Sequence, residues 1–160
     1  MTPALKILLV EDNPDYCREV KDYLHSANGS FNLATVDTYE KAREAVLANE
    51  YDAFLISRDF PNDQGLEIVS EISDLGRKGP TIILASEDNR QEETEAIQLG
   101  AMIYLHQDNL NDRILGRMIR HAIERKRFED RITSDKESLT HRVLALQDTS
   151  ERFEAQSAQY

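Results

Sequence analysis

Short apolar runs alternate with amphipathic stretches along most of the chain. Leu5 to Val10, Ala53 to Ile56 and Thr81 to Leu84 are nearly continuous apolar runs, each flanked by polar or turn residues. Runs of this kind are typical of strands that are buried on both faces of a parallel sheet. Leu33 to Val36 and Met102 to Leu105 are weaker runs that predict two further strands.

The stretches between these runs carry apolar residues at the spacing of a helix face. Their apolar positions are Tyr16, Val20, Tyr23 and Leu24, then Tyr39, Ala42, Ala45 and Val46, then Leu66, Val69 and Ile72, then Ala96, Ile97 and Ala101. Five strands alternating with helices predict a doubly wound α/β fold with a parallel sheet. The functional site of such a fold lies at the carboxyl ends of the strands.

From Asn109 onward the pattern changes to one long helix without proline. We therefore divide the chain into a core at residues 1–108 and a last helix that continues through 109–160. A heptad register runs through Met118, Ile132, Leu139, Leu146 and Phe153, with Arg125 as its exception. The companion positions are a mixture of apolar and polar residues, namely Leu115, Ala122, Glu129, Lys136, Val143, Ser150 and Ser157.

Half of this register is apolar and half is polar, which predicts a real but marginal coiled coil. The expected interface contains the apolar members from Met118 onward, which are Met118, Ala122, Ile132, Leu139, Val143, Leu146 and Phe153. The register therefore predicts a homodimer through this helix. A solvated single helix is the alternative, although such a helix needs packing to persist.

Composition limits the possible functions. The chain has 160 residues, 40% of them apolar, which is enough for one well-buried domain and an appendage. Residues 1–108 carry 9 Lys and Arg against 21 Asp and Glu, whereas 109–160 carry 10 against 9, so −12 and +1 give the net charge of −11. An acidic domain repels the phosphate backbone, so we expect no nucleic-acid partner.

No apolar run approaches the roughly 20 residues that cross a bilayer, and no signal segment follows Met1. We therefore expect a cytoplasmic protein with no membrane contact. The single cysteine, Cys17, excludes an internal disulfide and fits a small core position better than a nucleophile.

The segment from Asp52 to Leu66 is an apolar strand that leads into a Pro/Gly turn and then a helix. It resembles the third strand of two-component receiver domains, in which an aspartate ends the strand, a proline follows four residues later and a glycine eight residues later. Counting back from Pro61 and from Gly65 gives Ser57 both times. Serine has no carboxylate, so the acyl phosphate of these domains cannot form at this position.

Two further landmarks extend the resemblance over residues 4 to about 125. Leu8 to Asn13 is similar to the strand that ends in an acidic pair, and Gly100-Ala101 before Tyr104-Leu105 is similar to the turn and strand before the family's lysine. The resemblance implies a flavodoxin-like five-stranded sheet. It also implies a site in which acids hold Mg²⁺ while a hydroxyl residue and a lysine bind the phosphoryl group.

Three of these functional positions are changed in this chain. The acidic pair is present as Glu11 and Asp12, but Ser57 replaces the aspartate, Ala85 the hydroxyl residue and Gln107 the lysine. The pocket is therefore expected to be degenerate, with no catalytic residue and no enzymatic activity. Three independent losses argue against an error of alignment.

Neighbouring positions fit the same interpretation. Moving Ser86 into the hydroxyl position would require a one-residue shift, which reverses the face of a strand. Tyr104 corresponds to the family's switch aromatic, but Ala85 opposite it offers no hydroxyl partner. Asp108 occupies the place of a common cis-proline.

Two kinds of chemistry stay open at this site. Glu11, Asp12 and Asp59 would cluster oxygen ligands of the kind that Mg²⁺ prefers, although we expect no resident metal or cofactor. Asp59 is also an alternative phosphoacceptor. The four histidines are scattered singly and predict surface or capping roles.

Leu146 to Phe153 resembles the helical lead-in to PAS sensor domains, and Ile119 to Arg127 resembles the segment that joins a receiver to such a helix. The preferred hypothesis is a phosphorylation-incompetent receiver-like domain that dimerises and relays partner-binding signals. Its output would be a downstream module such as a diguanylate cyclase or a histidine kinase. The rivals are a Mg²⁺-dependent phosphoacceptor that uses Asp59 and a stand-alone adaptor. The sequence identifies neither the signalling partner nor the direction of regulation.

Overall fold

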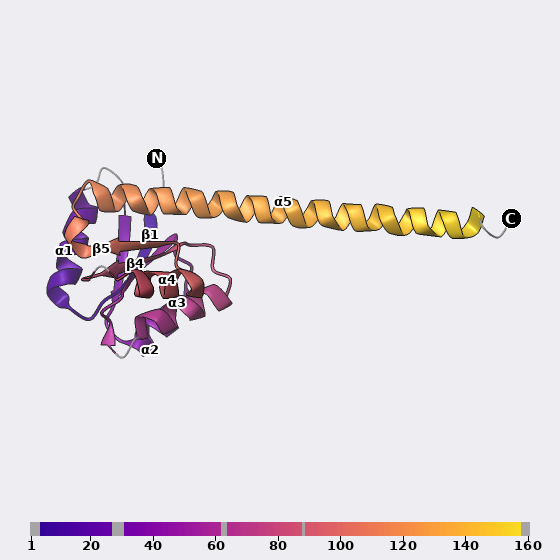
Figure 1. Cartoon of the computed structure of the whole chain (residues 1–160). Helices are drawn as coiled ribbons and strands as arrows, with labels where there is room; N and C mark the ends of the chain where they lie inside the picture. The colour runs from indigo at the N-terminus through magenta and orange to yellow at the C-terminus, as the bar shows by residue number, and fades with distance from the viewer. Residues whose placement is uncertain (1–3, 27–30, 62–63, 88, 158–160) are drawn as a thin grey trace. The chain divides into compact units, whose positions relative to one another are not determined.

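The computed structural model describes residues 4–26, 31–61, 64–87 and 89–157 (Figure 1). Strands and helices alternate along the chain, and each apolar run identified in the sequence forms a strand. The elements are β1 (Leu5–Val10), α1 (Pro14–Ser26), β2 (Phe31–Val36), α2 (Tyr39–Ala48), β3 (Ala53–Ser57), α3 (Gln64–Asp74), β4 (Thr81–Ala85), α4 (Arg90–Leu99), β5 (Ile103–His106), the 3₁₀ helix η2 (Gln107–Asn109) and α5 (Ile114–Ser157).

The five strands form one parallel sheet in the order β2-β1-β3-β4-β5. The doubly wound, flavodoxin-like α/β fold predicted from the sequence is therefore confirmed. β3 and β4 are buried along their whole length, and β1 is buried from Ile7 onward. The two edge strands, β2 and β5, are only partly buried because each has one neighbour.

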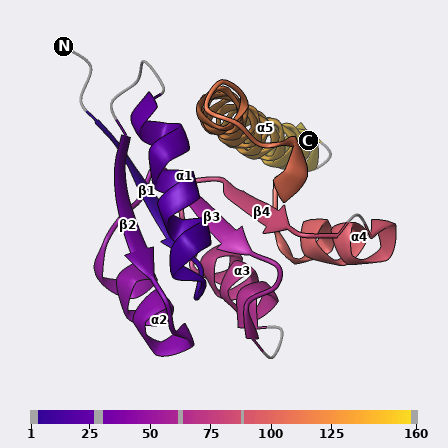
Figure 2. The same ribbon diagram turned by 90° about the vertical axis from the view of Figure 1, so that its left-hand side faces the viewer.

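Helices cover both faces of the sheet, as a parallel sheet requires (Figure 2). On one face, Leu9, Leu55 and Leu84 pack with α1 and with the first turns of α5. On the other face, Phe54 and Ile83 lie in a second core with α2, α3 and α4. Burial of each large apolar side chain stabilises the domain by roughly 1.5–3 kcal/mol.

Asparagine and threonine side chains define where several helices begin. Asn13 Oδ1 accepts a hydrogen bond from the Asp15 amide at 3.0 Å and thereby caps α1. Thr38 and Asn89 cap α2 and α4 in the same way. Asn111 Oδ1 accepts from the amides of Arg113 and Ile114, both at 2.9 Å, at the start of α5. Such caps stabilise a helix by about 1 kcal/mol each.

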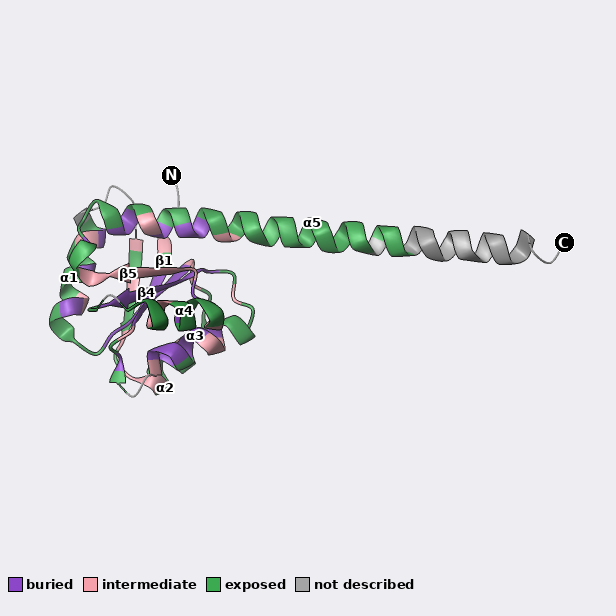
Figure 3. Ribbon diagram, viewed as in Figure 1, coloured by how far each residue is buried: buried purple, intermediate pink, exposed green. Residues whose placement is uncertain are grey.

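The chain forms two compact units, residues 1–126 and 127–160. Leu115 and Ile119 at the beginning of α5 are fully buried in the core of the first unit. Figure 3 shows buried positions along the first turns of α5. The boundary at residue 108 therefore falls inside that unit. The prediction that Ala122 belongs to the coiled-coil interface is wrong: Ala122 is buried in the same core, with 1% of its surface exposed, so its side chain packs against its own domain and is unavailable to a partner helix.

The second unit is helical through Ser157, where α5 ends. Side chains in this unit are described as far as Leu144, except that of His141. The predicted interface positions Leu146 and Phe153 therefore lie outside the described side chains. Among the described residues, no helix is both long and apolar enough to cross a membrane.

Gly65 at the start of α3 provides a test of how tightly the end of β3 is packed. A Cβ at this position would lie 2.5 Å from the Ser57 carbonyl oxygen, which is too close for any side chain. We expect Gly65→Ala to lower the free energy of unfolding by roughly 1–3 kcal/mol and to shift the amide resonances of Arg58 and Phe60. Urea unfolding and ¹H–¹⁵N spectra measure both effects.

Gly76→Ala is the matched control, because Gly76 has a φ of 65° and a Cβ added there would meet no atom within 4 Å. We expect Gly76→Ala to lower the free energy of unfolding by about 1 kcal/mol, through backbone conformation alone. The amide resonances of Arg58 and Phe60 should stay unchanged. A Gly65→Ala variant as stable as wild type would contradict the close packing at the end of β3.

Candidate functional site

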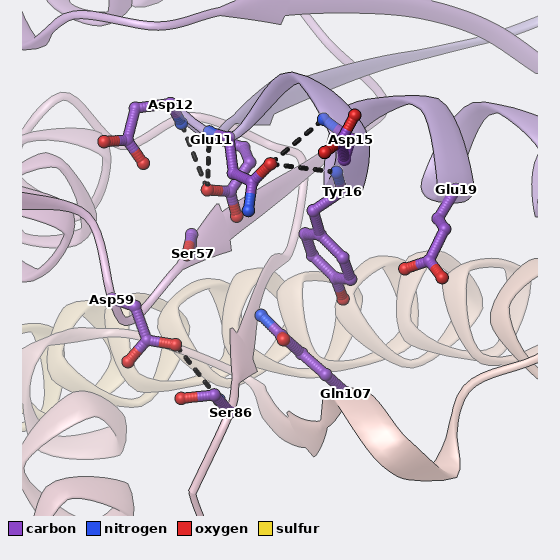
Figure 4. A pocket seen from close by; sticks show the side chains of 10 residues that line it. Glu11, Asp12, Asp15, Tyr16, Glu19, Ser57, Asp59, Ser86 and Gln107 are labelled. Atoms are coloured by element: carbon purple, nitrogen blue, oxygen red, sulfur yellow. Dashed lines mark hydrogen bonds between the residues drawn. The ribbon is translucent and has the colours of Figure 1, made fainter.

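The carboxyl ends of the parallel strands meet at one edge of the sheet and form an open, acidic pocket of about 620 Å³ (Figure 4). β1 leads into Glu11, β3 contributes Ser57 and the following loop contributes Asp59. We call this site the acidic pocket. It is lined by Glu11, Asp12, Asn13, Asp15, Tyr16, Glu19, Ser57, Asp59, Ser86 and Gln107.

Five of the predicted site residues are thus brought together, namely Glu11, Asp12, Ser57, Asp59 and Gln107. Ala85 ends β4 and is buried, with 1% of its surface exposed, but it does not line the pocket. Asp15, Tyr16 and Glu19 on α1 were not identified from the sequence. The spacing of Asp15 and Glu19, four residues apart, could have indicated that they share a helix face.

Glu11 is buried, with 4% of its surface exposed, and its carboxylate organises the turn after β1. Oε1 accepts hydrogen bonds from the backbone amides of Asp12 and Asn13, both at 3.1 Å. Burial raises the pKa of the Glu11 carboxyl above 4.5; the Ser57 hydroxyl and the Asn13 amide oppose this shift, and Asp12 adds to it. Glu11 is therefore a structural carboxylate whose charge carries a desolvation cost.

Ser57 stands at the end of β3 with none of its surface exposed. Its hydroxyl is near enough to Glu11 to lower the pKa of that carboxyl, yet no described atom forms a hydrogen bond of ordinary geometry with Ser57 Oγ. A buried hydroxyl without a partner is destabilising. The end of β3 thus carries a neutral, buried hydroxyl beside Glu11 that has no hydrogen bond of ordinary geometry with any described atom.

Asp59, the alternative phosphoacceptor, occupies a different environment. It is exposed in the loop after β3, and its Oδ2 accepts a hydrogen bond from the Ser86 amide at 3.2 Å. This bond ties the β3 loop to the end of β4. It also engages one of the two carboxylate oxygens of Asp59.

Arg58 makes a long-range connection that the sequence did not indicate. Its Nη2 donates to Glu92 Oε1 on α4 at 3.1 Å, with 13% and 34% of the two side chains exposed. The Tyr104 hydroxyl is buried, and no described atom accepts or donates a hydrogen bond to it. Burial raises the pKa of Tyr104, the charge of Glu92 adds to the shift and that of Arg58 opposes it, so both charges lie close to this aromatic.

Cys17 and His106 have local structural roles. The Cys17 thiol donates to the Glu11 carbonyl at 3.6 Å, and burial together with nearby carboxylates raises its pKa, which disfavours the nucleophilic thiolate. His106 Nδ1 accepts a hydrogen bond from the Asp108 amide at 3.1 Å and caps η2.

The donor set does not fit a divalent metal. Within the part of the chain that the structure describes, no three His, Cys, Asp or Glu residues are placed to hold a metal ion. One oxygen of Glu11 is bound to two backbone amides, and one oxygen of Asp59 is bound to the Ser86 amide. Ser57, which lies beside Glu11, adds a hydroxyl and no carboxylate to this set.

Comparison with known proteins identifies the family. The model of the response regulator receiver domain matches residues 7–140, and the chain belongs to this family. Response regulator MprA of Mycobacterium ulcerans is 27% identical over 146 residues, which are 89% of this chain and 60% of the relative. A cyclic di-GMP phosphodiesterase of Thermotoga maritima is 26% identical over 149 residues, 93% of this chain and 39% of the relative.

Solved receiver domains have the same fold. The receiver domain of the sensor histidine kinase PA1611 from Pseudomonas aeruginosa PAO1, with a magnesium ion in its active-site cleft, has a TM-score of 0.66 and 26% identity; the match covers 76% of this chain and 99% of that one. The receiver domain of a modulated diguanylate cyclase from Desulfovibrio desulfuricans G20 has a TM-score of 0.68 and 21% identity, covering 79% and 99%. The two curated relatives are longer, and this chain spans 39% to 60% of their length.

The buried carboxyl of Glu11 predicts an unusual dependence of stability on pH. Because its pKa is raised on folding, its contribution to the free energy of unfolding is fully present below about pH 4.5 and is lost as pH rises through the folded pKa. In Glu11→Gln the amide oxygen still accepts from the backbone and the amide NH₂ can donate to Ser57. We expect the free energy of unfolding of this variant to be roughly 1 kcal/mol higher than that of wild type at pH 8. The difference should shrink toward pH 4.5.

Thermal unfolding between pH 4.5 and pH 8 measures this difference. Glu19→Gln is the control, because it removes the same charge from an exposed position of the acidic pocket. Equal pH dependence of Glu11→Gln and wild type would show that Glu11 carries no desolvation cost.

Proposed function

We propose that this chain is a receiver domain that signals without being phosphorylated. The observation that carries the proposal is the fully buried Ser57 hydroxyl at the position of the phosphoaccepting aspartate. Ala85 has a methyl group where a hydroxyl would bind the phosphoryl group, and Gln107 has no charge to neutralise it. Phosphoryl transfer depends on positioning and charge stabilisation, so the loss of all three groups removes its basis.

The input is instead the binding of a signalling protein to the domain. The Arg58–Glu92 ion pair supports this view, because it already joins the end of β3 to α4 without a phosphoryl group. In the family, the switch aromatic responds to the hydroxyl after β4. Ala85 offers no such hydroxyl to Tyr104, whose own hydroxyl lies near the Arg58–Glu92 ion pair. The domain has no catalytic step of its own in this proposal.

The output runs through a coiled coil formed by the second unit with another copy of the chain. Phe128, Ile132, Leu139 and Val143 have between 38% and 60% of their surface exposed. At about 100° per residue they fall within roughly 60° of one another around the helix, which makes one apolar stripe. Ile132 and Leu139 are one heptad apart, which is the spacing that a second helix covers.

Glu129 and Lys136 also lie in the heptad register and weaken the interface. Met118 is half-buried within the first unit, so only part of its side chain is available to a partner helix. A marginal coiled coil of this kind suits a switch, because two helix registers of similar free energy can be shifted by a modest binding energy. The module that would read this change is a diguanylate cyclase or a histidine kinase.

Phosphorylation is tested directly by incubating the protein with acetyl phosphate and Mg²⁺ and measuring its intact mass. We expect no added phosphoryl group on wild type and little or none on Ser57→Asp, because Ala85 and Gln107 remain. The triple variant Ser57→Asp, Ala85→Thr, Gln107→Lys is the positive control and should gain one labile group. An adduct on wild type that disappears in Asp59→Asn would favour the alternative phosphoacceptor.

Dimerisation is tested by light scattering at micromolar concentration. The full chain should be dimeric and the chain that ends at Lys126 monomeric, because each apolar side chain covered by the partner contributes roughly 1.5–3 kcal/mol. Ile132→Asp with Leu139→Asp should make the full chain monomeric. Leu144→Asp is the matched control, since Leu144 is 58% exposed and lies outside the apolar stripe.

Two outcomes would contradict this arrangement. A dimer that survives truncation at Lys126 would place the interface on the first unit. A dimer that survives the double Asp substitution would show that the heptad register is wrong, even where the helix itself is retained by circular dichroism.

A further inference from the structure

The acidic pocket concentrates negative charge, and no basic side chain among its described lining residues balances it. Five carboxyl groups line it, from Glu11, Asp12, Asp15, Glu19 and Asp59, and none of the described residues that line it is basic. Glu11 is buried at its base, whereas the other four are more exposed around it. The family's lysine position is Gln107, so the cation that would occupy this space from within the chain is replaced by a neutral amide.

Two buried hydroxyl groups in the same pocket have no partner. Ser57 is fully buried and Tyr16 has 9% of its surface exposed, and no described atom makes a hydrogen bond with Ser57 Oγ or Tyr16 Oη. Figure 4 shows both side chains among the acids. Burial and the charge of Glu11 raise the pKa of Tyr16, so its hydroxyl stays neutral.

We propose that the acidic pocket receives the guanidinium group of an arginine side chain from a protein partner. A guanidinium carries five N–H donors and no acceptor, and the pocket offers carboxylate and hydroxyl oxygens as acceptors. Arginine is also less strongly hydrated than lysine, which reduces the cost of reaching the buried hydroxyl groups. The exposed carboxylates would attract the cation before contact.

The size of the pocket favours a side chain over a bare ion. A volume of about 620 Å³ lies in the range of sites for organic groups, far above what one metal ion fills. The described acids also include no set of three that is placed to hold a metal. The site is open to the surface, so an arginine on a partner's loop or helix can reach its exposed carboxylates without a rearrangement of the fold.

This inference deepens the proposed function, because it gives the chemistry of the partner, and it rests on that function only in requiring that no phosphoryl group forms in the pocket. The two ideas fail separately. Labelling by acetyl phosphate would refute the proposed function, whereas a titration with an arginine derivative reports on arginine binding alone.

The experiment is a titration of the ¹⁵N-labelled full chain with N-acetyl-arginine amide at low salt, followed in ¹H–¹⁵N spectra. We expect saturable shifts at Asp12, Asn13, Arg58 and Gln107, with a dissociation constant of about 1 mM, which is ordinary for one isolated side chain. The blocked citrulline amide, which has the same shape and no charge, should cause no shift. Added salt should weaken the binding because the carboxylates are exposed.

Four variants test the site. Asp12→Asn with Glu19→Gln should weaken binding about tenfold, whereas Asp74→Asn, at the C-terminal end of α3, should leave it unchanged. Gln107→Lys should abolish binding, because its ammonium group occupies the pocket from within. Ser57→Ala should weaken arginine binding, because it removes one of the hydroxyl acceptors of the pocket.

Several results would overturn the inference. These are equal shifts with citrulline amide, shifts spread over the acidic surface that respond equally to Asp74→Asn, and unchanged binding in Gln107→Lys. Saturation of the same amides by Mg²⁺ below about 1 mM with no effect of arginine amide would assign the pocket to a metal instead.

Discussion

Burial of β1, β3 and β4 on both faces is the constraint on which the rest of this structure depends. Strands covered on both sides have no face left for polar residues, so polar groups are displaced to the strand ends. Because all five strands are parallel, their carboxyl ends meet at one edge. The acidic pocket is a direct consequence of that topology, whatever chemistry its residues perform.

The same constraint explains how much the sequence predicts. The interior strands follow from their apolar runs almost residue for residue, and the gathering of Glu11, Ser57 and Gln107 follows from parallel pairing. The edge strands were less well defined: β2 begins at Phe31 and β5 extends to His106, because edge strands are half-exposed and their pattern is diluted by polar residues. The ends of an edge strand depend on its pairing with the adjacent strand, and a local sequence pattern does not show that pairing.

Two features could not be read from local patterns. The Arg58–Glu92 ion pair joins residues 34 positions apart through side-chain conformations, and no spacing rule connects a strand end with the first turn of α4. Ala122 satisfies the heptad register and nevertheless packs against its own sheet. Heptad arithmetic identifies which residues share a helix face, but the surface that covers that face is decided by tertiary structure.

Ser57 and Gln107 are best understood as a pair. Under the proposed correspondence with working receivers, serine would remove one negative charge and glutamine one positive charge, so the net charge of the pocket would be unchanged while its distribution would differ. The centre carries unpartnered hydroxyl groups, and the exposed charge lies on Asp12, Asp15, Glu19 and Asp59 around it. Restoring a carboxylate at position 57 alone would place it beside the buried Glu11 without a cation, where repulsion and desolvation favour its protonated form. Under that correspondence, one substitution at position 57 would not restore the charge arrangement of a working receiver.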